Sequence, residues 1–198
     1  MARTDTRNSL APIATRRGFI AASGAMLGVL AWWSTRKPAA AAVQSGPAGM
    51  VTIVPYTAAG VKQAPVTVAK VVKTDAEWQK QLTPIEYTVA RQDGTERPFT
   101  GKTWNLHDKG LYRCVCCDTA LYDSQTKFES GTGWPSFWQP IAAENIVQTS
   151  DRSFLMARTA ISCKRCDAHL GHVFEDGPKP TGLRYCMNSA AMNFVKHA

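Results

Sequence analysis

The sequence predicts a mainly β domain, built from short antiparallel strands, with short helices before them and a metal site among them. Three observations support this prediction. From Thr100 onward, short aromatic and β-branched runs alternate with glycine, proline, asparagine, aspartate and serine, which is typical of short strands joined by irregular loops. Two helix-start signals stand just before this region, and two C-x-x-C pairs lie within it.

Length and composition are those of one folded domain without a nucleic-acid partner. The chain has 198 residues and 44% of them are hydrophobic, which excludes global disorder. The net charge of +8 is concentrated in residues 1–42, which hold six basic side chains against Asp5 alone. Without them, 17 of the 23 basic and 14 of the 15 acidic side chains remain, a net charge of +3. We therefore expect no nucleic-acid partner.

Residues 1–42 resemble a twin-arginine export signal. Arg16 and Arg17 end a polar segment, and an apolar run of 15 residues, Phe19–Trp33, follows. This run is short for a membrane span, which needs about 20 residues, but it suits a signal peptide. Cleavage after Ala42 would leave a folded periplasmic protein with no stable membrane association. An uncleaved anchor is the alternative.

The elements before Thr100 are expected to be a strand pair and two helices. Residues 43–73 form an N-terminal extension in which two β-branched runs indicate a pair of strands. Each helix start has a threonine followed three residues later by a glutamate, a capping box. The pairs are Thr74 with Glu77 and Thr83 with Glu86. Gly94 stands where the second helix is expected to stop.

Four of the six cysteines are spaced as ligands of one metal ion. Cys114 with Cys117 and Cys163 with Cys166 are two C-x-x-C pairs, and both continue with aspartate and a small residue. Two such turns complete a tetrahedral zinc site, which is structural because four thiolates leave no open position. The alternatives are disulfides, redox-active dithiols and independent buried cysteines. The surplus Cys116 is a bystander or could exchange with a ligand.

The remaining cysteine, Cys186, is a candidate nucleophile. On a strand, Arg184 and Asn188 would share its face, and a nearby cation lowers the pKa of a thiol. A buried, inert cysteine is the alternative. His169 and His172 lie in one short run, and a histidine can transfer a proton near neutral pH. The run SGTGWPSFW places Trp134 in a rigid turn, as a core residue or as the wall of an apolar pocket.

From about Asp75 to the C-terminus, these runs resemble methionine-R-sulfoxide reductases of the B type. The resemblance rests on RQDGTERPFTG, GLYRCVCCDTALYDSQTKFESGTGWPSF and CKRCDAHLGHVFEDGPKPTGLRYCMNSAAMNF. It implies that residues 74–198 form an open barrel-like domain of two antiparallel sheets, with short N-terminal helices and a structural zinc. It also implies reduction of the R epimer of methionine sulfoxide in oxidised proteins, and hence protein repair. The catalytic and substrate-binding residues that it implies are Cys186, His172, His169, Asn188, Arg184, Trp134, Phe174 and Asp176.

The implied chemistry fits these residue types. The Cys186 thiolate attacks the sulfoxide sulfur and becomes a sulfenic acid, while His172 or a water that it holds protonates the leaving oxygen. The indole of Trp134 accepts the ε-methyl group. Many family members carry a resolving cysteine where this chain has Thr132. We therefore expect an external thioredoxin-like thiol to reduce Cys186, with Cys116 as the less favoured alternative, and we expect a monomer.

Three other functions fit the sequence less well. A zinc ribbon that binds nucleic acid lacks the expected basic stripe. A secreted protein held together by disulfides does not explain the paired C-x-x-C spacing. Thiol–disulfide exchange normally uses an exposed C-x-x-C beside a βαβ unit, which is missing here.

Overall fold

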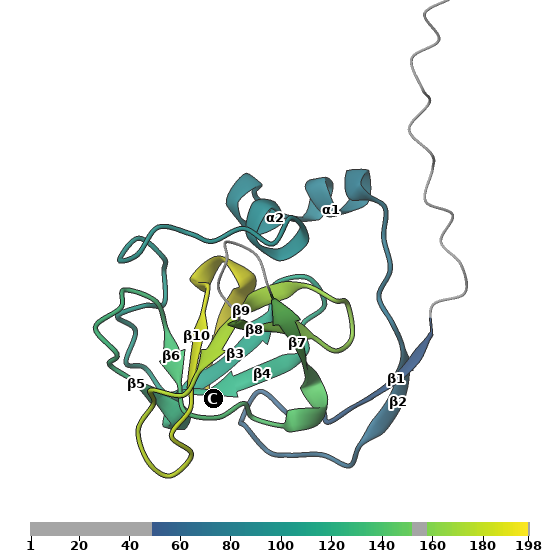
Figure 1. Cartoon of the computed structure of the whole chain (residues 1–198). Coiled ribbons are helices and arrows are strands. Elements are labelled where there is room, and N and C mark those ends of the chain that lie inside the picture. Colours follow the sequence, from purple (N-terminus) through teal and green to yellow (C-terminus); the bar gives the residue numbers. More distant parts are fainter. Residues whose placement is uncertain (1–48, 152–157, 198) are drawn as a thin grey trace, which may run out of the picture. The chain divides into compact units, whose positions relative to one another are not determined.

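Three antiparallel sheets and two short helices make up residues 49–151 and 158–197, the part of the chain that this computed structural model describes (Figure 1). A mainly β fold with several antiparallel sheets is thus confirmed. The open barrel-like arrangement stays a prediction, since the strands pair into separate sheets. The expected signal peptide, residues 1–42, lies outside the described ranges. Within them, no helix has the length and apolar character needed to cross a membrane.

The N-terminal extension holds a two-stranded sheet that is tied to the rest of the domain. Strand β1 (Met50–Ile53) pairs with β2 (Val66–Ala69) in antiparallel register. Just after β1, the backbone of Val54 exchanges two hydrogen bonds with the buried side chain of Asn145, at 2.7 and 2.8 Å. The same amide also donates to Ala120 O at 2.8 Å. One buried side chain therefore connects the extension to a strand of the main domain.

Both helices begin at the capping boxes that the sequence predicts. Helix α1 (Asp75–Gln81) follows Thr74, and α2 (Pro84–Arg91) follows Thr83, each with both reciprocal hydrogen bonds. Helix α2 ends at Arg91 rather than continuing to Gly94. Asp93 takes the left-handed backbone conformation, at φ 53°, and Gly94 N–H donates to Thr88 O at 3.0 Å. The glycine therefore satisfies a carbonyl of the last turns without itself ending the helix.

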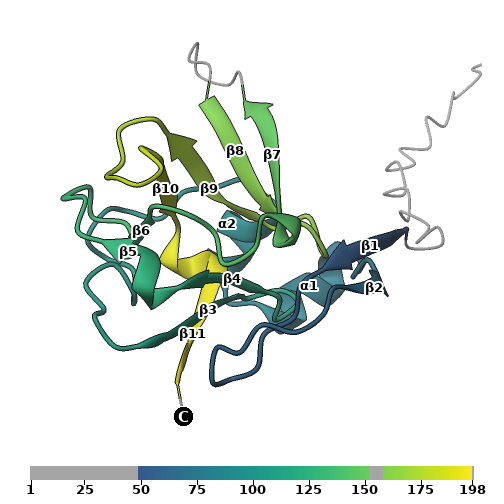
Figure 2. The same cartoon turned by 90° about the horizontal axis from the view of Figure 1, so that it is seen from below.

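The remaining strands form two larger sheets, seen from two directions in Figures 1 and 2. The three-stranded sheet has the order β11-β3-β4, with β3 (Gly110–Cys114), β4 (Ala120–Asp123) and β11 (Met192–Lys196). The six-stranded sheet has the order β5-β6-β10-β9-β8-β7. Its strands are β5 (Lys127–Phe128), β6 (Ser136–Phe137), β7 (Ile146–Asp151), β8 (Arg158–Cys163), β9 (His169–Phe174) and β10 (Arg184–Met187).

A cluster of aromatic rings packs the two larger sheets together. The ring of Phe137 on β6 stacks on Tyr122 of β4, with centroids 4.4 Å apart, and meets Tyr112 of β3 edge-on at 4.8 Å. Tyr122 Oη donates to Met187 Sδ on β10 at 3.1 Å. Tyr185 and Met187 thus belong to the core. Because side chains alternate along a strand, the residue between them must face away from the core.

Candidate active site and metal centre

Each C-x-x-C pair is the turn of a hairpin. Cys114 ends β3 before β4, and Cys163 ends β8 before β9. In both turns the aspartate that follows the pair donates its N–H to the first cysteine carbonyl at 2.9 Å. These aspartates, Asp118 and Asp167, have φ values of 60° and 57°, which aspartate tolerates better than most residues. The repeated aspartate in the sequence is therefore explained by two identical turns.

The four sulfurs of these turns meet in one cluster. All four Sγ atoms lie within 4.8 Å of one another, at 3.6 Å for Cys114–Cys166 and 3.5 Å for Cys117–Cys163. A disulfide requires about 2.05 Å, so these cysteines are not bonded to each other. Four thiolates at about 2.3 Å from a zinc ion would be about 3.8 Å apart. The cluster is therefore suited to a metal ion, which would fasten the three-stranded sheet to the six-stranded sheet.

Strand register brings Cys186 beside His172 and Ser136. Cys186 on β10 lies directly opposite His172 on β9 and Ser136 on β6. Directly opposed residues share one face of a sheet, and here it is the face turned away from the aromatic core. Arg184 and Phe174 are likewise opposed on this face. The structure thus gathers predicted residues that are far apart in the sequence.

A small pocket opens over Cys186. It has a volume of about 130 Å³ and is lined by Thr95, Trp134, Arg158, Gly171, His172, Phe174, Cys186, Met187 and Asn188. Five of these residues were predicted at the site. Pockets for drug-sized ligands measure roughly 300–1,000 Å³, so this one suits a single side chain rather than a whole peptide.

Burial and the nearby hydroxyl groups shift the pKa of the Cys186 thiol in opposite directions. Burial raises the pKa of Cys186 above its ordinary value, while Thr132, the Arg184 charge and Ser136 lower it by less. Thr132 Oγ1 lies 3.8 Å from the sulfur, and the Ser130 hydroxyl contacts the hydroxyls of Thr132 and Ser136 at 2.8 and 2.7 Å. Arg184 thus lowers the pKa of Cys186, as expected, but burial outweighs the charge and the net shift is upward.

Arg184 is held beside the pocket by two residues. Asp176 accepts two hydrogen bonds from its guanidinium at 2.8 Å each, which raises the pKa of Arg184 and lowers that of Asp176. The guanidinium also lies over the ring of Phe174, with its carbon 4.4 Å from the centroid. The Asp176 side chain is 62% exposed and does not line the pocket. It positions Arg184 instead.

The two histidines occupy different environments. His172 Nε2 is 2.9 Å from Asp151 Oδ2, which also accepts from Arg158 at 2.9 Å. His169 is buried, 5.3 Å from the His172 ring between centroids, and burial lowers its pKa. It lines a neighbouring polar pocket of about 410 Å³ rather than the Cys186 pocket. Sequence reasoning missed Asp151 and Arg158, because the hairpin register that brings them to His172 is not visible in the sequence.

Trp134 and Asn188 are both held by Glu96, which was also missed. The indole of Trp134 donates to Glu96 O at 3.1 Å, and Glu96 N–H donates to Asn188 Oδ1 at 3.0 Å. The turn before the indole requires glycine, since Gly133 has φ 86° and a Cβ there would lie 2.7 Å from the Phe99 nitrogen. Asn188 follows the end of β10 and donates from Nδ2 to Leu170 O at 3.1 Å. Its second Nδ2 hydrogen can serve a ligand.

Comparison with known proteins places this site in a family. Residues 82–196, more than half of the chain, match the family model described as the SelR domain. A peptide methionine sulfoxide reductase MsrB of Hahella chejuensis is 55% identical over 125 residues, or 63% of this chain and 90% of the relative. A protein of the same name from Herminiimonas arsenicoxydans is 54% identical over 125 residues, or 63% and 91%. The chloroplastic peptide methionine sulfoxide reductase B1 of Oryza sativa subsp. japonica is 57% identical over 124 residues, or 62% and 58%.

Proposed function

Because the chain belongs to the SelR domain family of peptide methionine sulfoxide reductases, we propose that Cys186 reduces the R epimer of methionine sulfoxide in the pocket above it. The chain is a peptide-methionine (R)-S-oxide reductase. What supports the role of Cys186 is one observation. Its sulfur shares a pocket of about 130 Å³ with an indole and an imidazole. The sulfurs of the two C-x-x-C turns, which we call the metal knuckles, instead lie together in the cluster of Cys114, Cys117, Cys163 and Cys166.

The reaction transfers one oxygen atom and two electrons. The Cys186 sulfur attacks the sulfoxide sulfur and forms a sulfur–sulfur bond, while the sulfur–oxygen bond of the substrate breaks and the protonated oxygen leaves as hydroxide. This oxygen then bonds to the Cys186 sulfur, the sulfur–sulfur bond breaks, and methionine leaves with the electron pair of that bond. Cys186 is oxidised to a sulfenic acid. Since burial raises the pKa of Cys186, the thiol brings its own proton. His172 takes that proton from the thiol and gives it to the departing oxygen, and Asp151 holds the imidazole in place at 2.9 Å.

The pocket combines apolar and polar groups, and we infer that their separate places in it select one epimer. The apolar indole and Phe174 accept the methyl group of the substrate, since methyl and sulfur groups pack well on aromatic rings. His172 and the second Nδ2 hydrogen of Asn188 donate hydrogen bonds to the sulfoxide oxygen. The opposite epimer would place its oxygen against the indole, where no donor is available because the indole N–H is bonded to Glu96.

We propose that an external thiol, such as a thioredoxin-like protein, reduces the sulfenic acid directly. Two external thiols become a disulfide, and the oxygen leaves as water. The chain has six cysteines, and the other five belong to the two metal knuckles. Among them Cys116 is not a ligand candidate, yet it is buried, with only 4% exposed. Mass spectrometry after one turnover should find Cys186 as a trapped sulfenic acid, and a Cys116–Cys186 disulfide would contradict direct reduction.

The metal ion that suits the knuckles is zinc, in a structural role. Four cysteine ligands whose sulfurs all lie within 4.8 Å of one another favour a tetrahedral thiolate-binding ion. Closed coordination leaves it no part in the reaction. The purified protein should contain about one zinc per chain, since a single group of four ligands is found in the described residues.

Export by the twin-arginine route to the periplasm is a further part of the proposal. It is supported by Arg16 and Arg17 before an apolar run of 15 residues. Export of an already folded protein suits a chain that must acquire its metal first. Replacing both arginines with lysine should retain the protein in the cytoplasm, and the mature protein should begin after Ala42. Unchanged export of that variant would contradict this route.

The test of the catalytic proposal is an assay with separated R and S epimers of a methionine sulfoxide peptide. Wild-type protein should reduce the R epimer, and Cys186→Ser should lose that activity while keeping its metal content and its unfolding midpoint. Because serine cannot be oxidised in this way, the loss should exceed about 1,000-fold. Activity in Cys186→Ser, or preference for the S epimer, would overturn the assignment.

A further inference from the structure

We propose that Glu96 is a positioning residue of the active site, which sets the place of Asn188 through the turn that follows it. The inference rests on the proposed function. Glu96 lies in the loop after α2, outside the pocket over Cys186, yet it contacts two of the residues that line that pocket, Trp134 and Asn188. It is 6% exposed, which is unusual for a carboxylate unless each oxygen has a partner.

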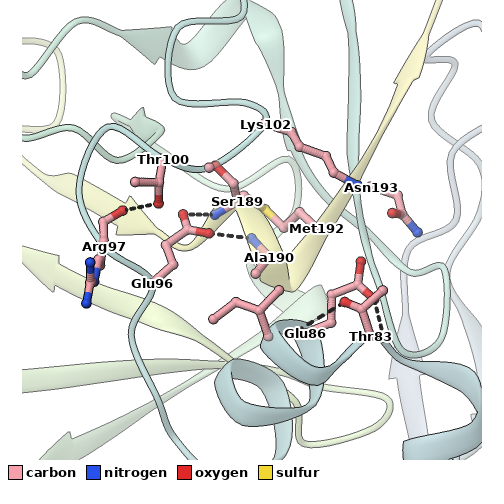
Figure 3. A pocket seen from close by; sticks show the side chains of 12 residues that line it. Thr83, Glu86, Glu96, Arg97, Thr100, Lys102, Ser189, Ala190, Met192 and Asn193 are labelled. Carbon is pink, nitrogen blue, oxygen red and sulfur yellow. Dashed lines mark hydrogen bonds between the residues drawn. The ribbon is translucent and has the colours of Figure 1, made fainter.

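Its carboxylate binds the main chain immediately after Asn188. Oε1 accepts from Ser189 N–H at 2.5 Å and Oε2 accepts from Ala190 N–H at 2.9 Å, as Figure 3 shows. These two residues begin the short 3-10 turn Ser189–Ala191. Hydrogen bonds to an ionised acceptor are about twice as strong as neutral ones. The carboxylate therefore fixes the backbone at the point where β10 leaves the sheet.

The main chain of Glu96 binds two residues that line the pocket, Asn188 and Trp134. Its N–H donates to Asn188 Oδ1 at 3.0 Å, and its carbonyl accepts from the Trp134 indole at 3.1 Å. One residue therefore makes four hydrogen bonds that link the loop, the turn after β10 and the tryptophan loop. Because Asn188 Oδ1 is occupied in this way and Nδ2 donates one hydrogen to Leu170 O at 3.1 Å, the second Nδ2 hydrogen is the group that we assign to the substrate oxygen.

The space for this contact is built into the neighbouring loop. A Cβ on Gly101 would lie 2.3 Å from Ser189 Oγ and 2.7 Å from Glu96 Oε1, so only glycine permits this approach. Thr103 Oγ1 lies 2.9 Å from Ser189 Oγ and fixes the same turn from the other direction. Loop 96–103 therefore contacts the turn directly, through the close approach at Gly101 and the hydroxyl of Thr103.

Cys186 itself does not depend on these contacts. It is held within β10 between β6 and β9, whereas Asn188 lies beyond the strand. Loss of the Glu96 carboxylate should therefore displace Asn188 and leave the thiol and the indole in place. The expected signature is a lower kcat with little change in KM and no change in the alkylation rate of Cys186.

The experiment is Glu96→Gln, which keeps the shape but turns an amide NH2 toward a backbone N–H. We expect kcat for the R epimer to fall about tenfold, because small misplacements of catalytic groups are costly, and KM to change less than about twofold. The matched control is Glu86→Gln. Glu86 lines the same pocket of about 490 Å³ in Figure 3 but caps α2 at Thr83 N, at 2.9 Å, without touching the site. Its kcat should equal that of wild type.

A double-mutant cycle separates positioning from general stability. In an Asn188→Ala background, Glu96→Gln should change kcat by less than about twofold, since the group that it positions is gone. A full tenfold effect in that background, or an equal loss in Glu86→Gln, overturns the inference. Should Glu96→Gln not fold, Glu96→Asp replaces it, with a smaller loss that again requires Asn188. Absence of Cys186-dependent activity in the wild-type protein would contradict the proposed function. That result comes from the wild type and Cys186→Ser, without any Glu96 variant, so the two proposals can be told apart.

Discussion

The knuckle cluster, formed by Cys114, Cys117, Cys163 and Cys166, and the Cys186 pocket are built from the same parts, antiparallel strands in fixed register, but leave their thiols in opposite situations. Exposure alone does not decide the role of a thiol, since Cys117 of the cluster and Cys186 are both half-buried, although the other three cluster cysteines are buried. Their neighbours do. Both sulfurs have a hydroxyl nearby, but Cys117 also lies 3.5 Å from another thiol, whereas Cys186 lies opposite an imidazole. The role of a thiol here follows from what its strand places beside it.

The largest effect that would test this comparison is expected at the knuckles. Cys163→Ser removes one of four ligands of a site that joins hairpins from two sheets. Because metal binding to such a site is folding free energy, the free energy of unfolding should fall on the order of 5 kcal/mol. Denaturant unfolding, together with metal analysis, measures this. Cys186→Ser should unfold at the wild-type denaturant concentration.

If the comparison were wrong, Cys163→Ser would keep wild-type stability and Cys186→Ser would lose it. Wild-type stability in a metal-free Cys163→Ser protein would show that the cluster does not hold the sheets together. A large loss of stability in Cys186→Ser would show that the lone cysteine is a core residue. Neither result is expected, because Cys186 faces away from the aromatic core to which Tyr185 and Met187 belong.

The knuckles and the helix starts could be predicted because their signals are local. Each C-x-x-C turn is closed by contacts within six residues, such as Asp118 N–H to Cys114 O at 2.9 Å. Each capping box, at Thr74 and at Thr83, spans four residues. In such stretches, residue spacing alone determines the geometry. The pairing of the two knuckles across 45 residues also followed, because a tetrahedral ion needs four ligands.

The surroundings of Cys186 could be predicted only in part. Cys186, His172 and Trp134 were identified by resemblance, but Asp151 and Glu96 were not. Asp151 reaches His172 through the register of β7, β8 and β9, and Glu96 reaches Asn188 from 92 residues away. The lowering effect of Arg184 on the pKa of Cys186 was expected, but the larger, opposite effect of burial was not. Spacing along one strand does not show burial.

A second, smaller effect concerns the pH dependence of the two kinds of thiol. Burial raises the pKa of Cys186 above its ordinary value of 9.0, so little thiolate is present at pH 7. Alkylation of Cys186 by iodoacetamide should therefore increase about tenfold per pH unit, without a plateau below pH 9. The metal-bound knuckle thiols should stay unlabelled throughout. Mass spectrometry of each cysteine gives the rates, and a plateau below pH 8 would mean that the Arg184 charge outweighs burial.

The smallest effect tests the hydroxyl that stands where a resolving cysteine is common. Thr132→Val keeps the branched shape but removes the hydroxyl 3.8 Å from the Cys186 sulfur, so the pKa of Cys186 should increase further. The alkylation rate at pH 8 should fall only about two- to threefold, since the contact is long and Ser136 and Arg184 remain. Thr52→Val, on the exposed strand β1, should leave the rate unchanged. A faster reaction in Thr132→Val would show that this hydroxyl does not stabilise the thiolate. The thiolate would then be stabilised by Ser136 and the Arg184 guanidinium.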